Sequence, residues 1–185
     1  RGVPIQVGYP RVTLAVALYP LDMAQLAVRY AAVPSGQAKI DLTGLTSVAE
    51  WQAHVDATDH AASLGLPVGV APGLYVLDAR SDRVKPGQTF VVYSDFALVA
   101  KEGRDTSAAW VARAPDGTVA PAATVQLYDA SGALMASAVT DSDGLARFET
   151  TGARFAAADV SGQRTVVGLD SNWVSSNYYY WWGRG

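Results

Sequence analysis

The sequence contains no cysteine among its 185 residues. Without cysteine the chain cannot form a disulfide, a zinc site built on thiolates, a cysteine nucleophile or a thioester made from a cysteine side chain. Only two residues are histidine and 17% are charged, and no base stands beside a nucleophile in any known catalytic pattern. We therefore expect a fold that depends on its hydrophobic core alone, with no catalytic site and no cofactor.

Long apolar runs and clusters of basic residues are also missing. No run approaches the roughly 20 apolar residues that cross a bilayer, so we expect no transmembrane segment. The 14 basic residues are scattered singly, without the stripe that neutralises several phosphates, so we expect no nucleic-acid partner. The chain begins at Arg1 and shows no signal-peptide pattern, which leads us to expect a piece of a longer protein.

The clearest pattern present is a strict alternation of apolar and polar residues from Ala49 to Ala57. Alternation of this kind predicts a half-buried strand. A helix is the competing interpretation, because Ser47 and Glu50 have the spacing of a capping box and Trp51 could share a helical face with its neighbours. We favour the strand, since a helix would scatter the small apolar residues around its circumference.

Similar short runs recur along the chain, separated by turn sequences such as Pro72-Gly73, Ser131-Gly132 and Asp143-Gly144. Their spacing is typical of a β-sandwich. A short helical turn is plausible only at Asp56 to Ser63. The predicted strands are residues 12–19, 25–30, 73–80, 89–100, 108–114, 124–128, 133–139, 146–149, 155–159 and 165–169.

The charged, turn-rich stretch from Ser81 to Gly87 predicts a boundary near residue 84, since linkers between domains have this composition. Sandwich domains of about 100 residues make two the natural count. We expect an all-β chain of two tandem immunoglobulin-like domains, at residues 1–84 and 85–170, followed by an aromatic-rich tail at 171–185.

The tail carries most of our candidate contact residues, because large aromatics are not expected to face water together. We expect it to pack on these domains or on a following one, and the alternative is that it binds a ligand or partner. Trp51 and Trp110 lie on alternating strands and are the expected core anchors. The candidate contacts are Trp173, Tyr178, Tyr179, Tyr180, Trp181 and Trp182.

Two polar clusters could be taken for metal sites. The first joins His54 and His60 with neighbouring aspartates, but its spacing gives no common face, and solvent-exposed polar residues are the better interpretation. The second, Asp141 to Gly144, begins like a calcium loop, but Gly152 stands where that loop needs a glutamate. A hairpin turn with Gly144 at positive φ is the better interpretation, and we expect no metal.

Three stretches together resemble the N-terminal macroglobulin-like domains of bacterial alpha-2-macroglobulins. PGLYVLDARSD, within Leu64 to Asp82, is similar to the closing strands of one such domain. YSDFALVAK and VQLYDASG followed by TDSDGLARF, within Phe90 to Phe148, are similar to the opening of the next, and TVVGLD at Thr165 to Asp170 fits its end. The resemblance implies two macroglobulin-like sandwich domains.

The resemblance also implies a role. The parent would be an extracytoplasmic protein, periplasmic or at the cell surface, that traps proteases, and these residues would be non-catalytic shell domains contacting other domains of the same chain. The family's thioester needs a cysteine, so it would lie elsewhere. Two alternatives stay open: a surface adhesin or carbohydrate-binding module using Tyr178 to Trp182, and a subunit of a surface layer or filament whose strand edges meet neighbouring copies.

Overall fold

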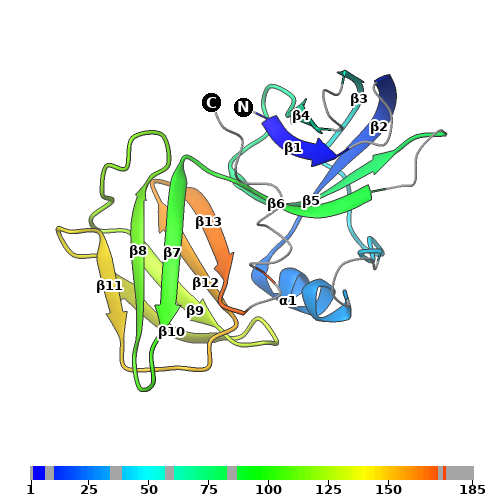
Figure 1. Ribbon diagram of the computed structural model, residues 1–185. Coiled ribbons are helices and arrows are strands. Elements are labelled where there is room, and N and C mark those ends of the chain that lie inside the picture. The colour runs from blue at the N-terminus through cyan, green and yellow to red at the C-terminus, as the bar shows by residue number, and fades with distance from the viewer. Residues whose placement is uncertain are drawn as a thin grey trace.

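The computed structural model describes residues 2–6, 11–33, 39–56, 61–82, 87–170 and 173. Within these ranges the chain forms strands β1 to β13 and one helix, α1, and each pairing between the strands is antiparallel. The predicted all-β class with sandwich domains is confirmed. Figure 1 shows two groups of strands set at an angle, with α1 near the point where they meet.

The first group, called the first unit, comprises the six strands up to residue 93. A four-stranded sheet in the order β3-β2-β5-β6 faces a two-stranded sheet, β1-β4. Every second residue of β2, from Val12 to Leu18, is buried in the core between these sheets, as expected for a strand with one face inward. The strands are β1 (Gly2–Gln6), β2 (Arg11–Pro20), β3 (Ala49–Asp56), β4 (Ala61–Gly65), β5 (Gly73–Arg80) and β6 (Gly87–Tyr93).

The second group, called the second unit, is a sandwich of seven strands. A sheet in the order β10-β9-β12-β13 packs on a sheet in the order β11-β8-β7. Its core contains Val111, Val125, Leu127 and Phe148. The strands are β7 (Phe96–Glu102), β8 (Ser107–Arg113), β9 (Thr124–Tyr128), β10 (Leu134–Val139), β11 (Leu145–Phe148), β12 (Phe155–Val160) and β13 (Gln163–Gly168).

The helix α1 (Met23–Ala32) contradicts the strand predicted at residues 25–30. A reciprocal capping box begins it: the backbone N–H of Gln25 donates to Asp22 Oδ1 at 2.7 Å, and the N–H of Asp22 donates to Gln25 Oε1 at 3.0 Å. These bonds satisfy two backbone donors that the first turn would otherwise leave unpaired. The sequence between Met23 and Ala32 consists largely of good helix formers.

The run predicted as one strand at residues 89–100 is divided into β6 and β7 by Ser94 and Asp95. β6 pairs with β5 along its whole length, with Gly87 opposite Ala79 at one end and Tyr93 opposite Gly73 at the other, so it completes the sheet of the first unit. The predicted boundary near residue 84 lies outside the described residues. We propose that the change from one unit to the other takes place at Ser94 and Asp95, where the chain passes between sheets.

The two tryptophans predicted as core anchors have different environments. Trp51, on β3, is half-buried and packs against the core of the first unit. Trp110 is not a core residue: its side chain is 36% exposed on the outer face of β8, and its Nε1–H donates to the carbonyl oxygen of Asp143 at 3.1 Å. Alternation along β8 directs Ala109 and Val111 into the core instead, because successive side chains point to opposite faces.

The helical turn predicted at Asp56 to Ser63 is also corrected where it can be compared. β3 continues to Asp56, and β4 begins at Ala61. Residues 57–60 lie outside the described residues. The strand predicted at residues 49–57 in place of a helix is confirmed from Ala49 to Asp56 by its unbroken pairing with β2.

Candidate interface between the two units

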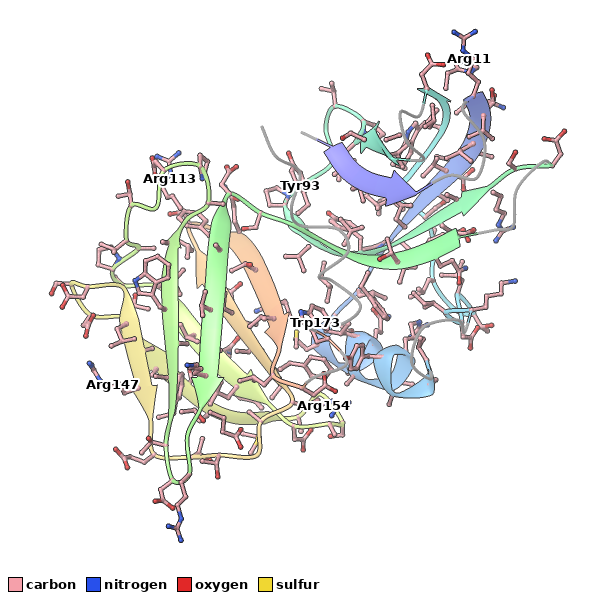
Figure 2. All side chains as sticks on the ribbon, in the orientation of Figure 1. Arg11, Tyr93, Arg113, Arg147, Arg154 and Trp173 are labelled. Atoms are coloured by element: carbon pink, nitrogen blue, oxygen red, sulfur yellow. The ribbon has the colours of Figure 1, made fainter. Side chains whose placement is uncertain are left out.

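The helix α1 packs one face against the second unit. Met23, Leu26, Ala27 and Tyr30 are buried and share a cluster with residues of β9, β12 and β13. Their spacing of three and four residues places them on one side of a helix. Figure 2 shows α1 beside the second unit, near the labelled side chains of Arg154 and Trp173.

Strand β12 is buried on both faces, which explains its continuous apolar run. Ala156 and Ala158 point into the core of the second unit. Phe155 and Ala157 point the other way, into the cluster with α1. A strand with both faces covered does not show the alternation of a surface strand. The continuous apolar run of β12 is therefore explained by the packing of α1 on the outside of the sandwich.

Four aromatic rings form the centre of this interface. The ring of Tyr30 lies 5.5 Å from those of Phe155 and Trp173, and 6.1 Å from that of Phe90 on β6, measured between centroids. The tilted and edge-on angles are those that aromatic pairs prefer. Trp173 is 5% exposed and lies directly over Gly168, so a β-carbon there would collide with the indole ring. The cluster therefore combines both units with Trp173, which follows β13 in the sequence.

A partly buried polar network lies beside the same ring. The hydroxyl of Tyr30 donates to Asp170 Oδ1 at 2.8 Å, and the backbone N–H of Trp173 donates to the same oxygen at 2.8 Å. Arg154 forms an ion pair with Asp170 Oδ2, and its guanidinium carbon lies 5.5 Å from the centroid of the Tyr30 ring. Burial, and then the hydrogen bond to Asp170, raise the pKa of Tyr30, so its phenol stays neutral.

The chain linking β6 to β7 makes a second attachment. The N–H of Asp95 donates to Gln163 Oε1 at 2.9 Å, and Gln163 Nε2 donates to Asp95 Oδ2 at 3.2 Å. Ala114 N–H donates to the carbonyl oxygen of Asp95 at 2.8 Å. Gln163 begins β13, whereas Asp170 follows its end, so the two attachments are separated by the length of a six-residue strand, or roughly 20 Å.

The turn between β9 and β10 adds a close backbone contact. Gly132 has φ of +83°, and a β-carbon there would lie 2.7 Å from Ala24 Cα and 2.8 Å from the carbonyl oxygen of Met23. Asp129 holds the turn by accepting the N–H groups of Ser131 and Ala133. Glycine is thus required both for its conformation and for the approach of α1.

Among the predicted contact residues, the structure places Trp173 in this cluster. Tyr178, Tyr179, Tyr180, Trp181 and Trp182 lie outside the described residues. Sequence reasoning did not select Tyr30 or Phe155. The capping-box spacing of Asp22 and Gln25 and the doubly apolar run of β12 are the signals that could have identified them.

The polar clusters considered as metal sites have other partners. Asp141 Oδ1 accepts the N–H groups of Asp143 and Leu145 at 3.0 Å, and Gly144 has φ of +74°, so the predicted turn with glycine at positive φ is confirmed. It is not a hairpin, because β10 pairs with β9 whereas β11 pairs with β8 in the other sheet. His54 Nδ1 lies 2.9 Å from Thr13 Oγ1. In the part of the chain that the structure describes, no three acidic, histidine or cysteine residues form a metal-binding group. No helix there is long and apolar enough to span a membrane.

Comparison with known proteins gives a family match for part of the chain. Residues 93–176 match the family model of the bacterial alpha-2-macroglobulin MG3 domain. This confirms the predicted resemblance over that segment, which comprises just under half of the sequence. No curated protein sequence matches the chain.

Solved structures extend the likeness in fold to both units. A crystal structure of native Escherichia coli alpha-2-macroglobulin spanning domains NIE-MG1 aligns with a TM-score of 0.67 at 18% identity, covering 91% of this chain and 88% of that one. One spanning MG0-NIE-MG1 aligns with a TM-score of 0.62 at 16% identity, covering 92% and 59%. A Salmonella alpha-2-macroglobulin mutant, Y1175G, aligns with a TM-score of 0.54 at 17% identity, covering 91% of this chain and 11% of that one.

Proposed function

We propose, from the premise that residues 93–176 form a domain of the bacterial alpha-2-macroglobulin MG3 type, that this chain is a rigid pair of shell domains in a protease-trapping protein. Its role is mechanical: it would hold neighbouring domains at a fixed angle and would carry out no catalysis. The chain spans about a tenth of the Salmonella protein that it resembles in fold, so trapping would belong to the whole parent protein.

The observation that carries this proposal is the core shared by the two units. Leu26 is fully buried and Phe155 is 1% exposed, although they come from different units. Interfaces between domains that move freely are usually small and polar. This one is apolar at its centre and contains a partly buried ion pair, which favours a fixed arrangement over a hinge.

Two attachments support the rigid arrangement more strongly than one would. A single contact would leave the units free to rotate about it, whereas contacts at both ends of β13 restrain bending and twisting together. The linker between β6 and β7 has only two residues, Ser94 and Asp95, and both of its ends enter sheets. Any large rearrangement of the parent would then occur at other junctions.

The partners and location follow from the same premise. We propose that the chain contacts other domains of its parent, that proteases are targets of the whole protein, and that the parent is periplasmic or at the cell surface. We also propose that Tyr178 to Trp182 contact a following domain. The adhesin or carbohydrate-binding alternative depends on these same residues and stays a prediction, since they lie outside the described part of the chain.

The test uses the parent protein and two substitutions on α1. Leu26→Asp introduces a charge at a fully buried position, whereas Val28→Asp does so at a side chain that is 63% exposed. A trapped protease should lose activity toward a large protein substrate but keep activity toward a short peptide. We expect the parent and the Val28→Asp variant to cause this selective loss and the Leu26→Asp variant to be impaired. A parent that leaves large-substrate cleavage unchanged would contradict trapping, and equal trapping by both variants would contradict the need for a rigid junction.

A further inference from the structure

The outer edge of β3 differs from the other sheet edges that the structure describes. β10 has a register irregularity between Leu134 and Ala136, and β11 has only four residues. The edges of β7 and β13 are covered because these strands lie beside each other, and β6 lies near β13. The strands β1 and β4 are short, with five residues each. Bulges, short lengths and coverage of this kind are the usual protection of sheet edges.

Strand β3 has neither a bulge nor a short length. Its eight residues pair with β2 without a break in register, with Ala49 opposite Leu18 at one end and Asp56 opposite Arg11 at the other. It contains no proline and no lysine. β4 packs against it from the other layer, but among the described residues no further strand pairs with its outer edge. Its backbone N–H and C=O groups on that side are therefore a template for one more strand.

The side chains of β3 indicate which strand fits. When two copies of β3 run antiparallel with Gln52 opposite Gln52, Glu50 lies opposite His54, and Trp51 lies opposite Ala53. Residues directly opposite in an antiparallel pair point to the same face. The first pairing places two amides together, the second a carboxylate beside an imidazole, and the third a large side chain beside a small one.

Burial agrees with this register. Glu50, Gln52 and His54 are exposed on the outer face, whereas Trp51 and Ala53 are half-buried at the margin of the core. A second strand would cover the free side of Trp51. Moving the axis by one residue, to Ala53, would place Glu50 opposite Asp56, and like charges directly opposite are unfavourable. The Gln52-centred register avoids that repulsion.

We propose that β3 is a self-association edge, through which two copies of this chain pair antiparallel about Gln52 and join their four-stranded sheets. The interface would be isologous, with the same residues contributed by each copy. It lies on the first unit, away from the shared core, so a fixed arrangement of the units does not require it. Failure of this proposal would leave the proposed shell role intact.

Charge substitutions at Gln52 test the proposal on the whole 185-residue chain. Gln52→Lys and Gln52→Glu each place two like charges at the axis, so we expect each variant alone to associate at least about tenfold more weakly. An equal mixture of the two variants should restore association, because lysine would then face glutamate. Val68→Lys, at a fully exposed turn position, is the control and should associate like the unsubstituted chain. Sedimentation equilibrium measures the association constant of each variant, of the mixture and of the unsubstituted chain.

A single introduced cysteine gives an independent measurement, because the chain has none of its own. Under mild oxidation, Gln52→Cys should form a disulfide-linked dimer much faster than Val68→Cys. An unsubstituted chain that remains monomeric up to about 1 mM, the weak end of specific affinities, would overturn the proposal. Association that is unchanged in the Gln52→Lys variant would also overturn it, by placing the contact elsewhere.

Discussion

The second unit has two outer sheet faces, and both carry apolar side chains. On the β10-β9-β12-β13 sheet, Phe155 and Val166 are 1% and 6% exposed. On the β11-β8-β7 sheet, Val99 and Trp110 are 55% and 36% exposed. The residue types are alike, and the difference is the presence of α1 over the first face. An apolar residue at an outward strand position therefore does not show by itself whether that face is covered.

The cover comes from a distant part of the sequence. Tyr30 and Asp170 are 140 positions apart, yet they share a hydrogen bond. The helix α1 of the first unit covers the outer face of the β10-β9-β12-β13 sheet and so forms a third layer on the two sheets of the second unit. Substitutions on the two faces should therefore have unequal effects, and those on the covered face should also disturb the arrangement of the units.

The largest expected difference is between Phe155→Ala and Trp110→Ala. Removing the Phe155 ring leaves a cavity at the shared core and should lower the free energy of unfolding by about 3 to 5 kcal/mol. Removing the partly exposed Trp110 should cost roughly 1 kcal/mol. Urea unfolding of both variants measures this. Equal losses would mean that the two faces are equally important to stability.

A smaller difference should separate two glycines that share the same backbone conformation. Gly132 and Gly162 have φ of +83° and +79°, but only Gly132 meets α1; nothing lies within 4 Å of the β-carbon position at Gly162. Alanine at either site bears a similar backbone penalty of roughly 1 kcal/mol, and at Gly132 it should also displace the helix. We expect Gly132→Ala to have the lower Tm in calorimetry. A matching Tm would show that the turn does not hold α1.

The third expected difference concerns alkaline pH. The pKa of Tyr30 is raised in the folded chain, so its neutral phenol stabilises the fold at pH values below the ordinary tyrosine pKa of about 10. That stability is lost as the pH rises above 10. Tyr30→Phe should lower the free energy of unfolding at pH 8 by about 1 to 3 kcal/mol, through the lost bond to Asp170.

The same variant should also lose less stability between pH 8 and pH 11, measured by urea unfolding. The unsubstituted chain, measured under the same conditions, is the reference. If Tyr30→Phe lost as much stability as the unsubstituted chain, the Tyr30 phenol would not contribute to the alkaline loss of stability.

Much of the fold could be predicted from the sequence, because strands with one buried face alternate visibly. The bounds predicted for β5 and β9 agree with the structure. The helix was missed because Leu26 and Tyr30 also fit a short apolar run, and the capping box at Asp22 was not weighed against it. Ser94 and Asp95 were overlooked because apolar residues continue on both sides of them.

The interface was harder to predict than the strands. Trp110 has apolar neighbours in the sequence and is 36% exposed, whereas Trp173 has mostly polar neighbours and is 5% exposed. The sequence near each residue does not contain the cause, which is the position of α1 and Gly168 in space. Local pattern specifies which way a side chain points from its strand, and only the packing of distant elements decides what it meets.

The most direct measurement is the distance between spin labels at Val68→Cys in the first unit and Val139→Cys in the second, positions that are exposed in a cysteine-free chain. Dilution of the labelled protein with unlabelled chain removes any contribution from pairs of molecules. Two units held by a shared core should give one narrow distance distribution, which broadens when Leu26→Asp is added. A broad or bimodal distribution without that substitution would show that the units move independently and that the junction is a hinge.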